Sequence, residues 1–369
     1  MFYLIYQKMA GLQTVVNNYY SELVRRKELK IDFLTLLPSD EAMLKEYSDL
    51  GSNIYYIKGE KERNLHLFIK EIKNFFKKHH DYDIIHSHQT NFDFFYLKEA
   101  KKYNIPIRIM HSHSTSYDIN KYRMFITRKL STYYSNCHFA CSEEAGRFYF
   151  GKKFGRDKND YIVNNAVNLN IFKFDENMRQ YVREKLNLKN MFVIGNVARM
   201  TAVKNHKFLI DVFYEVLKIN NNSFLFLVGD GPTKEELMDY AQKKGIYDKI
   251  NFYGTTNKVN EIMQCFDCLV LPSLFEGVPL TLIEAEASGI KCIFNKNIDS
   301  HLKDSPLELK LGLDIGAHEF ANRIINFCKD SKREDIRKII ENSNFDISVE
   351  ANKLYYEYIK LMKGSRKYA

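Results

Sequence analysis

Short apolar segments rich in β-branched and aromatic residues alternate with longer amphipathic segments along the whole chain. Strands that alternate with helices of roughly ten to fifteen residues form βαβ units, and the strands of such units are parallel. The alternation occurs in two series, and a chain of 369 residues has room for about two domains. The pattern therefore predicts an α/β fold with two Rossmann-like, doubly wound domains that face a cleft.

Two groups of expected strands define the two domains. The first series covers residues 2–6, 31–37, 54–57, 84–86, 107–111, 138–140 and 161–163. The second covers 191–196, 223–228, 268–271 and 291–294, with a further strand at Phe252. Residues 164–170, between the series, are rich in Asn, which favours turns. We place the domain boundary there, between residues 165 and 166. The second domain is expected to end at residue 346, before an amphipathic helix over residues 347–362.

The composition excludes several classes of protein. The 25 Tyr and 27 Phe residues rule out a disordered or low-complexity chain. No uncharged apolar run reaches the roughly 18 residues of a membrane-spanning helix, and residues 1–6 lack the basic region of a signal peptide. We therefore expect a cytoplasmic protein with reduced thiols. Cys265 and Cys268 form a CxxC pair without further thiols or His at zinc-ligand spacing, which favours a buried helix-to-strand corner over a zinc site.

The positive charge is concentrated in the first half of the chain. Residues 1–165 contain 26 Lys and Arg against 19 Asp and Glu, whereas residues 166–369 contain 29 against 27. This asymmetry points the first half towards an anionic partner, such as nucleic acid, a phosphorylated substrate or a membrane surface. Segments 122–134 and 146–156 are both basic and aromatic, which suits an anionic membrane. Base stacking and a solvated helix face are the alternatives.

Segment 271–289 predicts an anion site at the start of a helix. An apolar strand leads into a loop with Glu276, Gly277 and Pro279, and an apolar helix follows. A helix N-terminus with a glycine-bearing loop offers free N–H groups to a diphosphate. Glu276 and Glu284 are eight residues apart and can face the same cleft, where carboxylates would accept hydrogen bonds from sugar or ribose hydroxyls. The alternative is an acidic first turn and one surface Glu.

Two cations follow the first strand of the second series. Arg199 and Lys204 lie on the loop after residues 191–196, where Arg offers bidentate phosphate contact and Lys a point charge. They could neutralise a diphosphate, or they could simply be solvated. Gly229, after the next strand, and Gly11, after the first strand of the chain, could each bring backbone close to a nucleotide, although tight turns alone also need glycine.

Two His-x-His pairs end neighbouring expected strands of the first domain. They are His86 with His88 and His111 with His113. A metal site is one interpretation, but no Asp or Glu stands beside them at ligand spacing. We favour a polar strand end in an active-site cleft.

Taken together, these segments resemble the family 4 retaining glycosyltransferases, which have the GT-B fold. The resemblance covers nearly the whole chain and is carried by segments 195–205, 226–232 and 272–289. Segments 111–116 and 139–146 are similar to the N-terminal domain of the bacterial enzymes that extend capsular polysaccharide, exopolysaccharide or O-antigen.

The resemblance implies a donor site for a nucleotide-sugar, with UDP as the expected nucleotide, mainly in the C-terminal domain. Arg199 and Lys204 would bind the diphosphate, with Gly11 beside it. The residues implied for the donor sugar and nucleotide are Glu276, Gly277, Val278, Pro279, Leu280, Glu284, Gly229 and Tyr253. Neither a cofactor nor a metal is implied, because cations and a helix N-terminus meet the departing diphosphate.

The resemblance also implies an acceptor site in the N-terminal domain, made of residues 1–165 with about 347–369, onto which the final helix crosses back. The acceptor would be a lipid-diphosphate-linked glycan at the anionic inner face of the plasma membrane. His113 or His111 would lie at the reacting centre with Glu276. Nucleic acid is not expected as a partner.

Other functions remain open at this stage. A nucleotide-sugar epimerase or a glycan phosphorylase could share the fold, although nothing marks the pyridoxal phosphate lysine that a phosphorylase needs. A catalytically silent scaffold would not need Arg199, Lys204, Glu276 and Glu284 together. An RNA-binding protein is suggested by charge alone, without a recognition signature.

Overall fold

The chain divides into two compact units in a computed structural model. Unit 1 comprises residues 1–166 and 347–369, and unit 2 comprises residues 167–346. The predicted boundary lies one residue before this division. The structure describes residues 2–6, 10–26, 28–35, 41–58, 64–88, 92–113, 120–276, 279–298, 302, 305–330 and 333–365.

Unit 1 contains a seven-stranded sheet in the order β3-β2-β1-β4-β5-β6-β7, with parallel neighbours throughout. Its strands are β1 (Phe2–Tyr6), β2 (Ile31–Thr35), β3 (Ile54–Tyr56), β4 (Ile84–Ser87), β5 (Ile107–Ser112), β6 (Cys137–Ala140) and β7 (Asp160–Ile162). Its helices are α1 (Ala10–Leu23), α2 (Glu41–Asp49), α3 (Leu65–Lys78), α4 (Asp93–Lys102), α5 (Lys121–Tyr134), α6 (Glu143–Phe150) and α14 (Ile347–Ser365).

Unit 2 contains a six-stranded parallel sheet in the order β10-β9-β8-β11-β12-β13. Its strands are β8 (Phe192–Val197), β9 (Ser223–Val228), β10 (Ile250–Gly254), β11 (Cys268–Leu271), β12 (Lys291–Asn295) and β13 (Glu308–Leu311). Its α-helices are α7 (Glu176–Lys185), α8 (His206–Ile219), α9 (Lys234–Lys243), α10 (Val259–Met263), α11 (Leu280–Ala287), α12 (Gly316–Phe327) and α13 (Arg337–Glu341). Short 3-10 turns are η1 (Ala202–Lys204), η2 (Tyr247–Lys249) and η3 (Leu313–Ile315).

The predicted pair of doubly wound domains is confirmed. In each sheet the first strand of the series lies inside, and the strand order reverses beside it. Two details differ from the sequence prediction. The expected strand 31–37 is described only to Thr35, since residues 36–40 lie outside the described residues. Strand β13 was not expected, because Glu308 and Lys310 interrupt its apolar pattern at the edge of the sheet.

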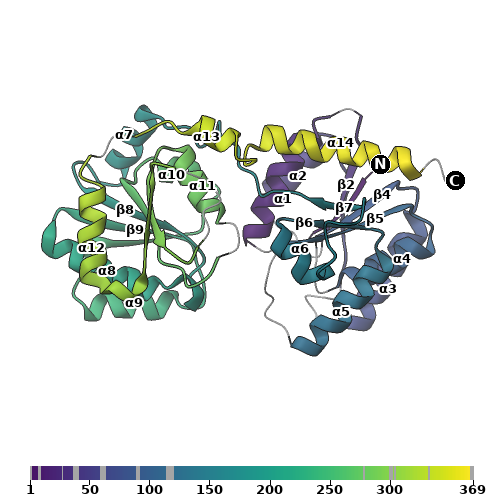
Figure 1. The fold of residues 1–369 in the computed structure, drawn as a ribbon, viewed down its shortest axis with the longest axis horizontal. Helices are drawn as coiled ribbons and strands as arrows, with labels where there is room; N and C mark the ends of the chain where they lie inside the picture. Colours follow the sequence, from purple (N-terminus) through teal and green to yellow (C-terminus); the bar gives the residue numbers. More distant parts are fainter. Residues whose placement is uncertain are drawn as a thin grey trace. The chain divides into compact units, whose positions relative to one another are not determined.

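Helix α14 belongs to unit 1, although it follows unit 2 in the sequence. It lies alongside α1, as the yellow and purple helices of Figure 1 show. The Tyr358 ring of α14 is fully buried, and its hydroxyl lies 3.1 Å from the hydroxyl of Tyr20 on α1. The Asn164 side chain donates to Glu350 of α14 at 3.0 Å. Helix α14 is therefore part of the core of unit 1.

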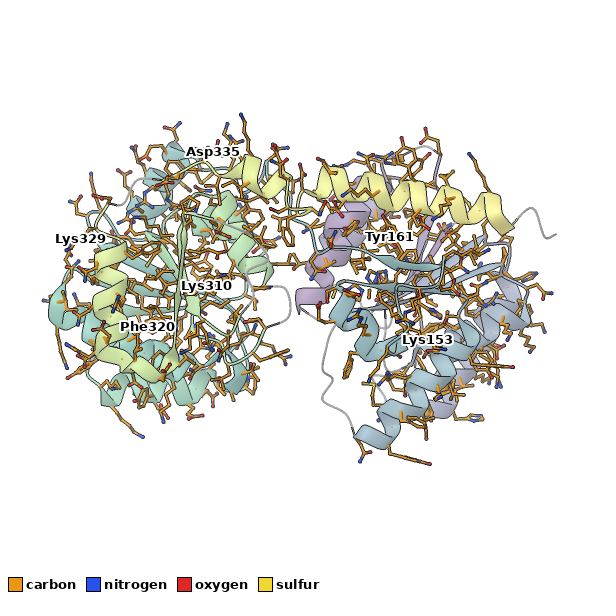
Figure 2. All side chains as sticks on the ribbon, in the orientation of Figure 1. Lys153, Tyr161, Lys310, Phe320, Lys329 and Asp335 are labelled. Carbon is orange, nitrogen blue, oxygen red and sulfur yellow. The ribbon has the colours of Figure 1, made fainter. Side chains whose placement is uncertain are left out.

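The core of unit 2 covers both faces of its sheet with apolar side chains. Phe320 of α12, labelled in Figure 2, is fully buried and packs edge-on against Phe208 of α8.

Cys265 and Cys268 are also fully buried, at the corner that joins α10 to β11. Burial raises the pKa of the Cys265 thiol to about 12, so this thiol stays protonated. Among the described residues, the CxxC pair belongs to no cluster with metal-ligand geometry.

Candidate functional site

The strand order of unit 2 places the loop after β8 next to the loop after β11. The central strand β8 pairs with β9 on one side and with β11 on the other. In a parallel sheet, ligands bind outside the carboxyl ends of the strands where the order reverses. The segments that leave β8 and β11 at this edge are 198–205 and 272–279, and they contain Arg199, Lys204 and Glu276.

Segment 198–205 is held by backbone hydrogen bonds to the turn after β9. The Ala198 N–H donates to the Val228 carbonyl at 3.0 Å, and the Met200 N–H donates to the Asp230 carbonyl at 2.9 Å. This turn needs glycine, because a Cβ at Gly229 would lie 2.1 Å from the Ala198 carbonyl oxygen. Gly229 therefore has a structural reason to be present in addition to its predicted contact with the donor.

Segment 272–276 is held against the end of segment 198–205. The Leu274 N–H donates to the Val203 carbonyl at 2.8 Å. The Asn205 side chain, whose backbone is left-handed with φ 55°, donates to the Pro272 carbonyl at 3.2 Å. The Asn295 side chain, at the end of β12, donates to the Ser273 carbonyl at 2.9 Å. The sequence analysis did not predict these contacts of Asn205 and Asn295, because a single Asn that bonds to a distant backbone carbonyl belongs to no recognisable sequence motif.

The result of this packing is an ion pair between two predicted donor residues. The Lys204 ammonium lies 2.6 Å from both carboxylate oxygens of Glu276. The Lys204 side chain is 26% exposed and that of Glu276 is 10% exposed, so the pair is accessible from one side. Arg199 is exposed, and within the described residues it has no ion-pair partner. Counting only the described residues, the site thus offers Arg199 as a cation without an ion-pair partner and Lys204 as a cation held by a carboxylate.

The start of α11 lies beside this ion pair in sequence. Pro279 and Leu280 open the helix, and the Thr281 hydroxyl donates to the Val197 carbonyl at 3.3 Å, which ties the helix to the end of β8. Gly277 and Val278 lie outside the described residues. Pro279 has no N–H to donate, so its predicted role cannot be a backbone hydrogen bond to the donor.

Glu284 differs from Glu276 in its surroundings. Its residue is only 7% exposed, and burial raises the pKa of its carboxyl group to about 7. Within the described residues, no hydrogen bond or ion pair joins Glu284 to Lys204 or Glu276. A buried carboxyl group with a raised pKa at a strand-end site is a recognised mark of function.

Two other predicted donor residues belong to elements other than the two loops of the ion pair. Gly11 is the second residue of α1 and belongs to unit 1. Tyr253 lies on β10, at the edge of the second sheet, where 39% of its surface is exposed. Its ring packs against Phe226 with centroids 5.2 Å apart. Tyr253 therefore presents an aromatic face near the Gly229 turn, since Gly254 accepts a hydrogen bond from Gly229 at 2.8 Å.

In unit 1, the two His-x-His pairs form a single cluster. Strands β4 and β5 are neighbours, and His86 pairs with Ile109, so the His residues of both strands lie on one face. The sequence does not show the register between neighbouring strands. Because side chains alternate between the two faces of a sheet, that register decides which His residues share a face, so the four residues were not predicted to form one cluster. His86, His88 and His111 are buried, and His113 follows them at the end of β5.

Hydrogen bonds connect the four imidazoles. His86 Nε2 lies 3.1 Å from His111 Nδ1, and His88 Nδ1 lies 2.7 Å from His113 Nε2. His86 Nδ1 lies 2.7 Å from the Tyr358 hydroxyl of α14. Burial lowers the pKa of His86, His88 and His111 well below the usual value, and that of His113 to about 3. All four rings are therefore neutral near pH 7.

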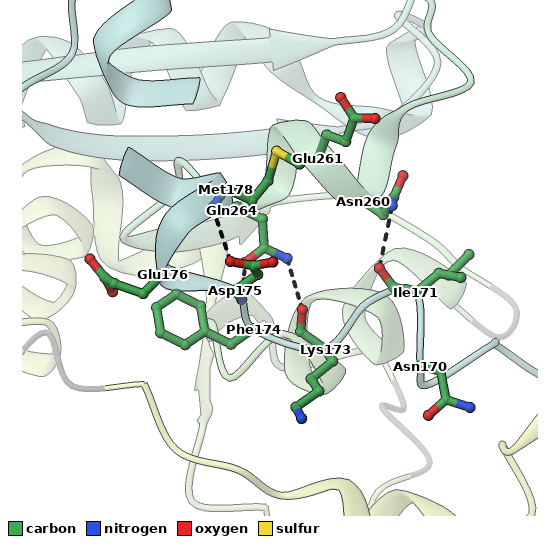
Figure 3. Close-up of a pocket in the computed structure, with 10 residues that line it drawn as sticks. All are labelled: Asn170, Ile171, Lys173, Phe174, Asp175, Glu176, Met178, Asn260, Glu261 and Gln264. Carbon is green, nitrogen blue, oxygen red and sulfur yellow. Dashed lines mark hydrogen bonds between the residues drawn. The ribbon is translucent and has the colours of Figure 1, made fainter. Parts of the chain in front are cut away.

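A pocket of ≈ 460 Å³ lies elsewhere in unit 2 (Figure 3). It is lined by Asn170, Ile171, Lys173, Phe174, Asp175, Glu176, Met178, Asn260, Glu261 and Gln264. Several of its polar groups bond within the chain. Asp175 caps α7 by accepting from the Met178 N–H at 3.0 Å, and the Gln264 side chain donates to the Lys173 carbonyl at 3.2 Å. None of the predicted donor residues lines this pocket.

Comparisons with known proteins show what the chain is similar to. Residues 178–344 match the family described as Glycosyl transferases group 1, and these residues include Arg199, Lys204, Glu276 and Glu284. The Bacillus subtilis (strain 168) protein EpsF, which is named as a glycosyltransferase, is 28% identical over 91% of this chain and 90% of its own. An Escherichia coli protein named UDP-Gal:alpha-D-GlcNAc-diphosphoundecaprenol alpha-1,3-galactosyltransferase is 24% identical over 77% of this chain and 76% of its own.

Solved structures share the fold. Anabaena Alr3699/HepE, solved in complex with UDP-glucose, superposes with a TM-score of 0.77 at 17% identity, over 97% of this chain and 99% of that one. WaaG, described as a glycosyltransferase involved in lipopolysaccharide biosynthesis, superposes with a TM-score of 0.68 at 14% identity, over 93% and 94% of the two chains. The fold is therefore GT-B, and the chain is a glycosyltransferase.

The raised pKa of Glu284 predicts a pH-dependent gain in stability when this carboxyl group is removed. Between pH 4.5, its usual pKa, and about 7, the unfolded chain releases the proton while the folded chain retains it. Stability therefore falls as the pH rises through this window. The Gln side chain of Glu284→Gln has no proton to release. The free energy of unfolding of this variant, relative to that of wild type, should therefore rise by on the order of 3 kcal/mol between pH 5 and pH 8.

Urea denaturation at both pH values measures this difference. The matched control is Glu319→Gln on α12, whose side chain is 45% exposed and which should follow wild type at both pH values. A Glu284→Gln variant whose stability relative to wild type does not change between pH 5 and pH 8 would contradict the role of burial at this position.

Proposed function

We propose that this glycosyltransferase moves a sugar from a UDP-sugar to a lipid-linked glycan, with retention of the anomeric configuration, in the synthesis of a bacterial surface polysaccharide. The observation that carries the proposal is the Lys204–Glu276 pair at the strand-order reversal of unit 2, with Arg199 beside it in sequence. The name of the Escherichia coli relative and the UDP-glucose complex of HepE support this substrate class.

We assign each donor residue the role that the family resemblance implies. Arg199 and Lys204 would bind the diphosphate, and Lys204 would exchange part of its contact with Glu276 for a phosphate oxygen. Glu276 would then be free to accept hydrogen bonds from hydroxyls of the donor sugar. Glu284, farther along α11, would accept from the ribose hydroxyls. These groups stabilise the charge on the departing UDP without a metal ion.

We further propose that unit 1 meets the acceptor at an anionic membrane. Unit 1 contains 31 Lys and Arg against 21 Asp and Glu, whereas unit 2 contains 24 against 25. Helix α5 exposes Tyr122, Phe125, Ile126 and Tyr133 at 74%, 58%, 39% and 67%, respectively. Their spacing of three, four and seven residues places them along one stripe of the helix. An exposed stripe of this kind beside basic residues is typical of a helix that lies in a membrane interface.

The structure also sorts the basic residues of this region. Arg128 is used inside the unit, since its Nε donates to the Tyr149 carbonyl at 2.6 Å. Arg147 is paired with Glu143 at 2.5 Å. Lys129 on α5 is exposed, as are Lys152 and Lys153 after α6, and these residues contribute positive charge to unit 1. Lys153 is labelled in Figure 2. Among the described residues, no helix has the length and hydropathy of a membrane span.

The first test of the proposal removes the cations of the donor site. A panel of UDP-sugars first identifies the donor by thermal shift, since a ligand at 100 times its Kd adds about 2.7 kcal/mol of stability. Lys204→Ala and Arg199→Ala should then each lower kcat at saturating donor about a hundredfold or more, because the diphosphate charge is left unbalanced. Lys207→Ala, an exposed cation on the adjacent helix α8, should turn over like wild type. Full activity in both site variants would refute the assignment.

The second test measures binding to vesicles of rising anionic-lipid content by co-sedimentation. Replacing Lys129, Lys152 and Lys153 with Ser should weaken binding, at about 1 kcal/mol per charge, and Phe125→Ser should weaken it further at every salt concentration. Lys185→Ser with Lys189→Ser removes exposed charge from unit 2 and should leave binding intact. Equal binding to neutral and anionic vesicles, or binding to neither, would mean that the stripe does not meet a membrane.

A further inference from the structure

Among the residues that the structure describes, three buried ring nitrogens of the His cluster have no hydrogen-bond partner. They are His88 Nε2, His111 Nε2 and His113 Nδ1. A buried polar atom left unsatisfied costs roughly 1–3 kcal/mol, and the great majority of such atoms are paired in folded proteins. Three of them within one group of stacked rings, whose centroids lie 3.9–5.2 Å apart, indicate that the cluster binds something beyond the protein chain.

The positions of the ring nitrogens match those of metal ligands. One ligand nitrogen from each of His86, His88 and His111 lies within 4.8 Å of the other two. The distance of 3.1 Å between His86 Nε2 and His111 Nδ1 is close to the edge of a tetrahedron, about 3.3 Å, when Zn–N bonds are about 2.0–2.1 Å long. His88 contributes the third nitrogen through Nε2, which has no hydrogen-bond partner among the described residues. In this geometry the ion takes up His88 Nε2, whereas His111 Nε2 and His113 Nδ1 are not ligands.

The remaining nitrogens of two ligands are already oriented by neighbours. His86 Nδ1 lies 2.7 Å from the Tyr358 hydroxyl, and His88 Nδ1 lies 2.7 Å from His113 Nε2. A metal-bound His almost always donates its second ring N–H to such an acceptor, which fixes the tautomer and the orientation of the ring. In this arrangement Tyr358 and His113 are supporting residues of the site, and the metal ligands are His86, His88 and His111.

The donor set also indicates which cation fits. The three ligands are all imidazoles, which suit zinc, copper and nickel, whereas magnesium and calcium require oxygen ligands. Burial keeps the rings neutral, and a neutral ring is the form that binds a metal. Three protein ligands leave the fourth tetrahedral position to water or another exchangeable ligand.

We propose that His86, His88 and His111 bind one Zn²⁺ ion at the carboxyl ends of β4 and β5. The ion joins the neighbouring strands β4 and β5. Because His86 of β4 also contacts Tyr358 of α14, the ion stabilises the part of unit 1 where α14 packs. The site is independent of the donor proposal, which concerns residues of unit 2. It also separates the two candidate catalytic His residues, because His111 becomes a ligand and His113 keeps a free Nδ1.

Equilibrium dialysis of the full chain against Zn²⁺, followed by elemental analysis, tests the site without any substrate. Wild type should retain one zinc per chain, with a dissociation constant of roughly 1 µM or tighter. Replacement by Co²⁺ should give the visible absorption of a four-coordinate site. His88→Asn should abolish retention, and Tyr358→Phe should weaken it about 10- to 100-fold, because it removes the group that orients His86.

His318→Asn is the matched control, since His318 lies on α12 of unit 2 with 73% of its side chain exposed, and it should bind zinc like wild type. Circular dichroism confirms that each variant is folded. Because buried His variants could misfold, the wild-type stoichiometry decides the proposal by itself. Wild type with less than a tenth of an equivalent of bound zinc would mean that the rings form hydrogen bonds with each other only. Tyr358→Phe with unchanged zinc affinity would contradict the role of Tyr358 as a supporting residue of the site.

Discussion

The candidate donor site depends on the pairing of β8 with β11 in the second sheet. This pairing aligns Cys268 with Ile194 and Leu269 with Gly195. Gly195 permits it, because a Cβ at that position would lie 2.1 Å from the ring of Phe266. Once these strands are neighbours, the loops that carry Lys204 and Glu276 leave the sheet side by side, although the two residues are 72 positions apart in sequence.

The ion pair at this position suits a site that must bind a charged substrate and release a charged product. Each group balances the other before the donor arrives, so neither charge is left alone at a partly buried position. A diphosphate then competes with the Glu276 carboxylate for the Lys204 ammonium. Arg199, which is exposed, provides the additional positive charge that draws the donor in.

Much of the fold and donor site could be predicted from the sequence, for physical reasons. The alternation of apolar strands and amphipathic helices predicts parallel sheets, and strand ends in parallel sheets are where ligands bind. Arg199, Lys204 and Glu276 follow strands directly, so their common location was predictable. The contact between Lys204 and Glu276 was not, because it depends on the hydrogen bonds of Asn205 and Asn295 to the segment after β11.

Other features depend on information that a single sequence does not contain. The His cluster arises from the register between β4 and β5, and the contact of Tyr358 with His86 joins residues 272 positions apart. Strand β13 has polar residues because it lies at a sheet edge, which only the assembled sheet reveals. The sequence predicts Arg128 as a surface cation, but in the structure its Nε donates a hydrogen bond to the Tyr149 carbonyl.

Hydrogen–deuterium exchange with and without UDP tests the central claim, that the donor binds where the strand order of unit 2 reverses. The account predicts slower exchange in segments 198–205 and 272–284 when UDP is added, because backbone amides there become hydrogen-bonded and excluded from water. Segments 170–178 and 260–264, which line the pocket of Figure 3, should exchange as before. Protection of those pocket segments, with no change in 198–205 and 272–284, would contradict the account.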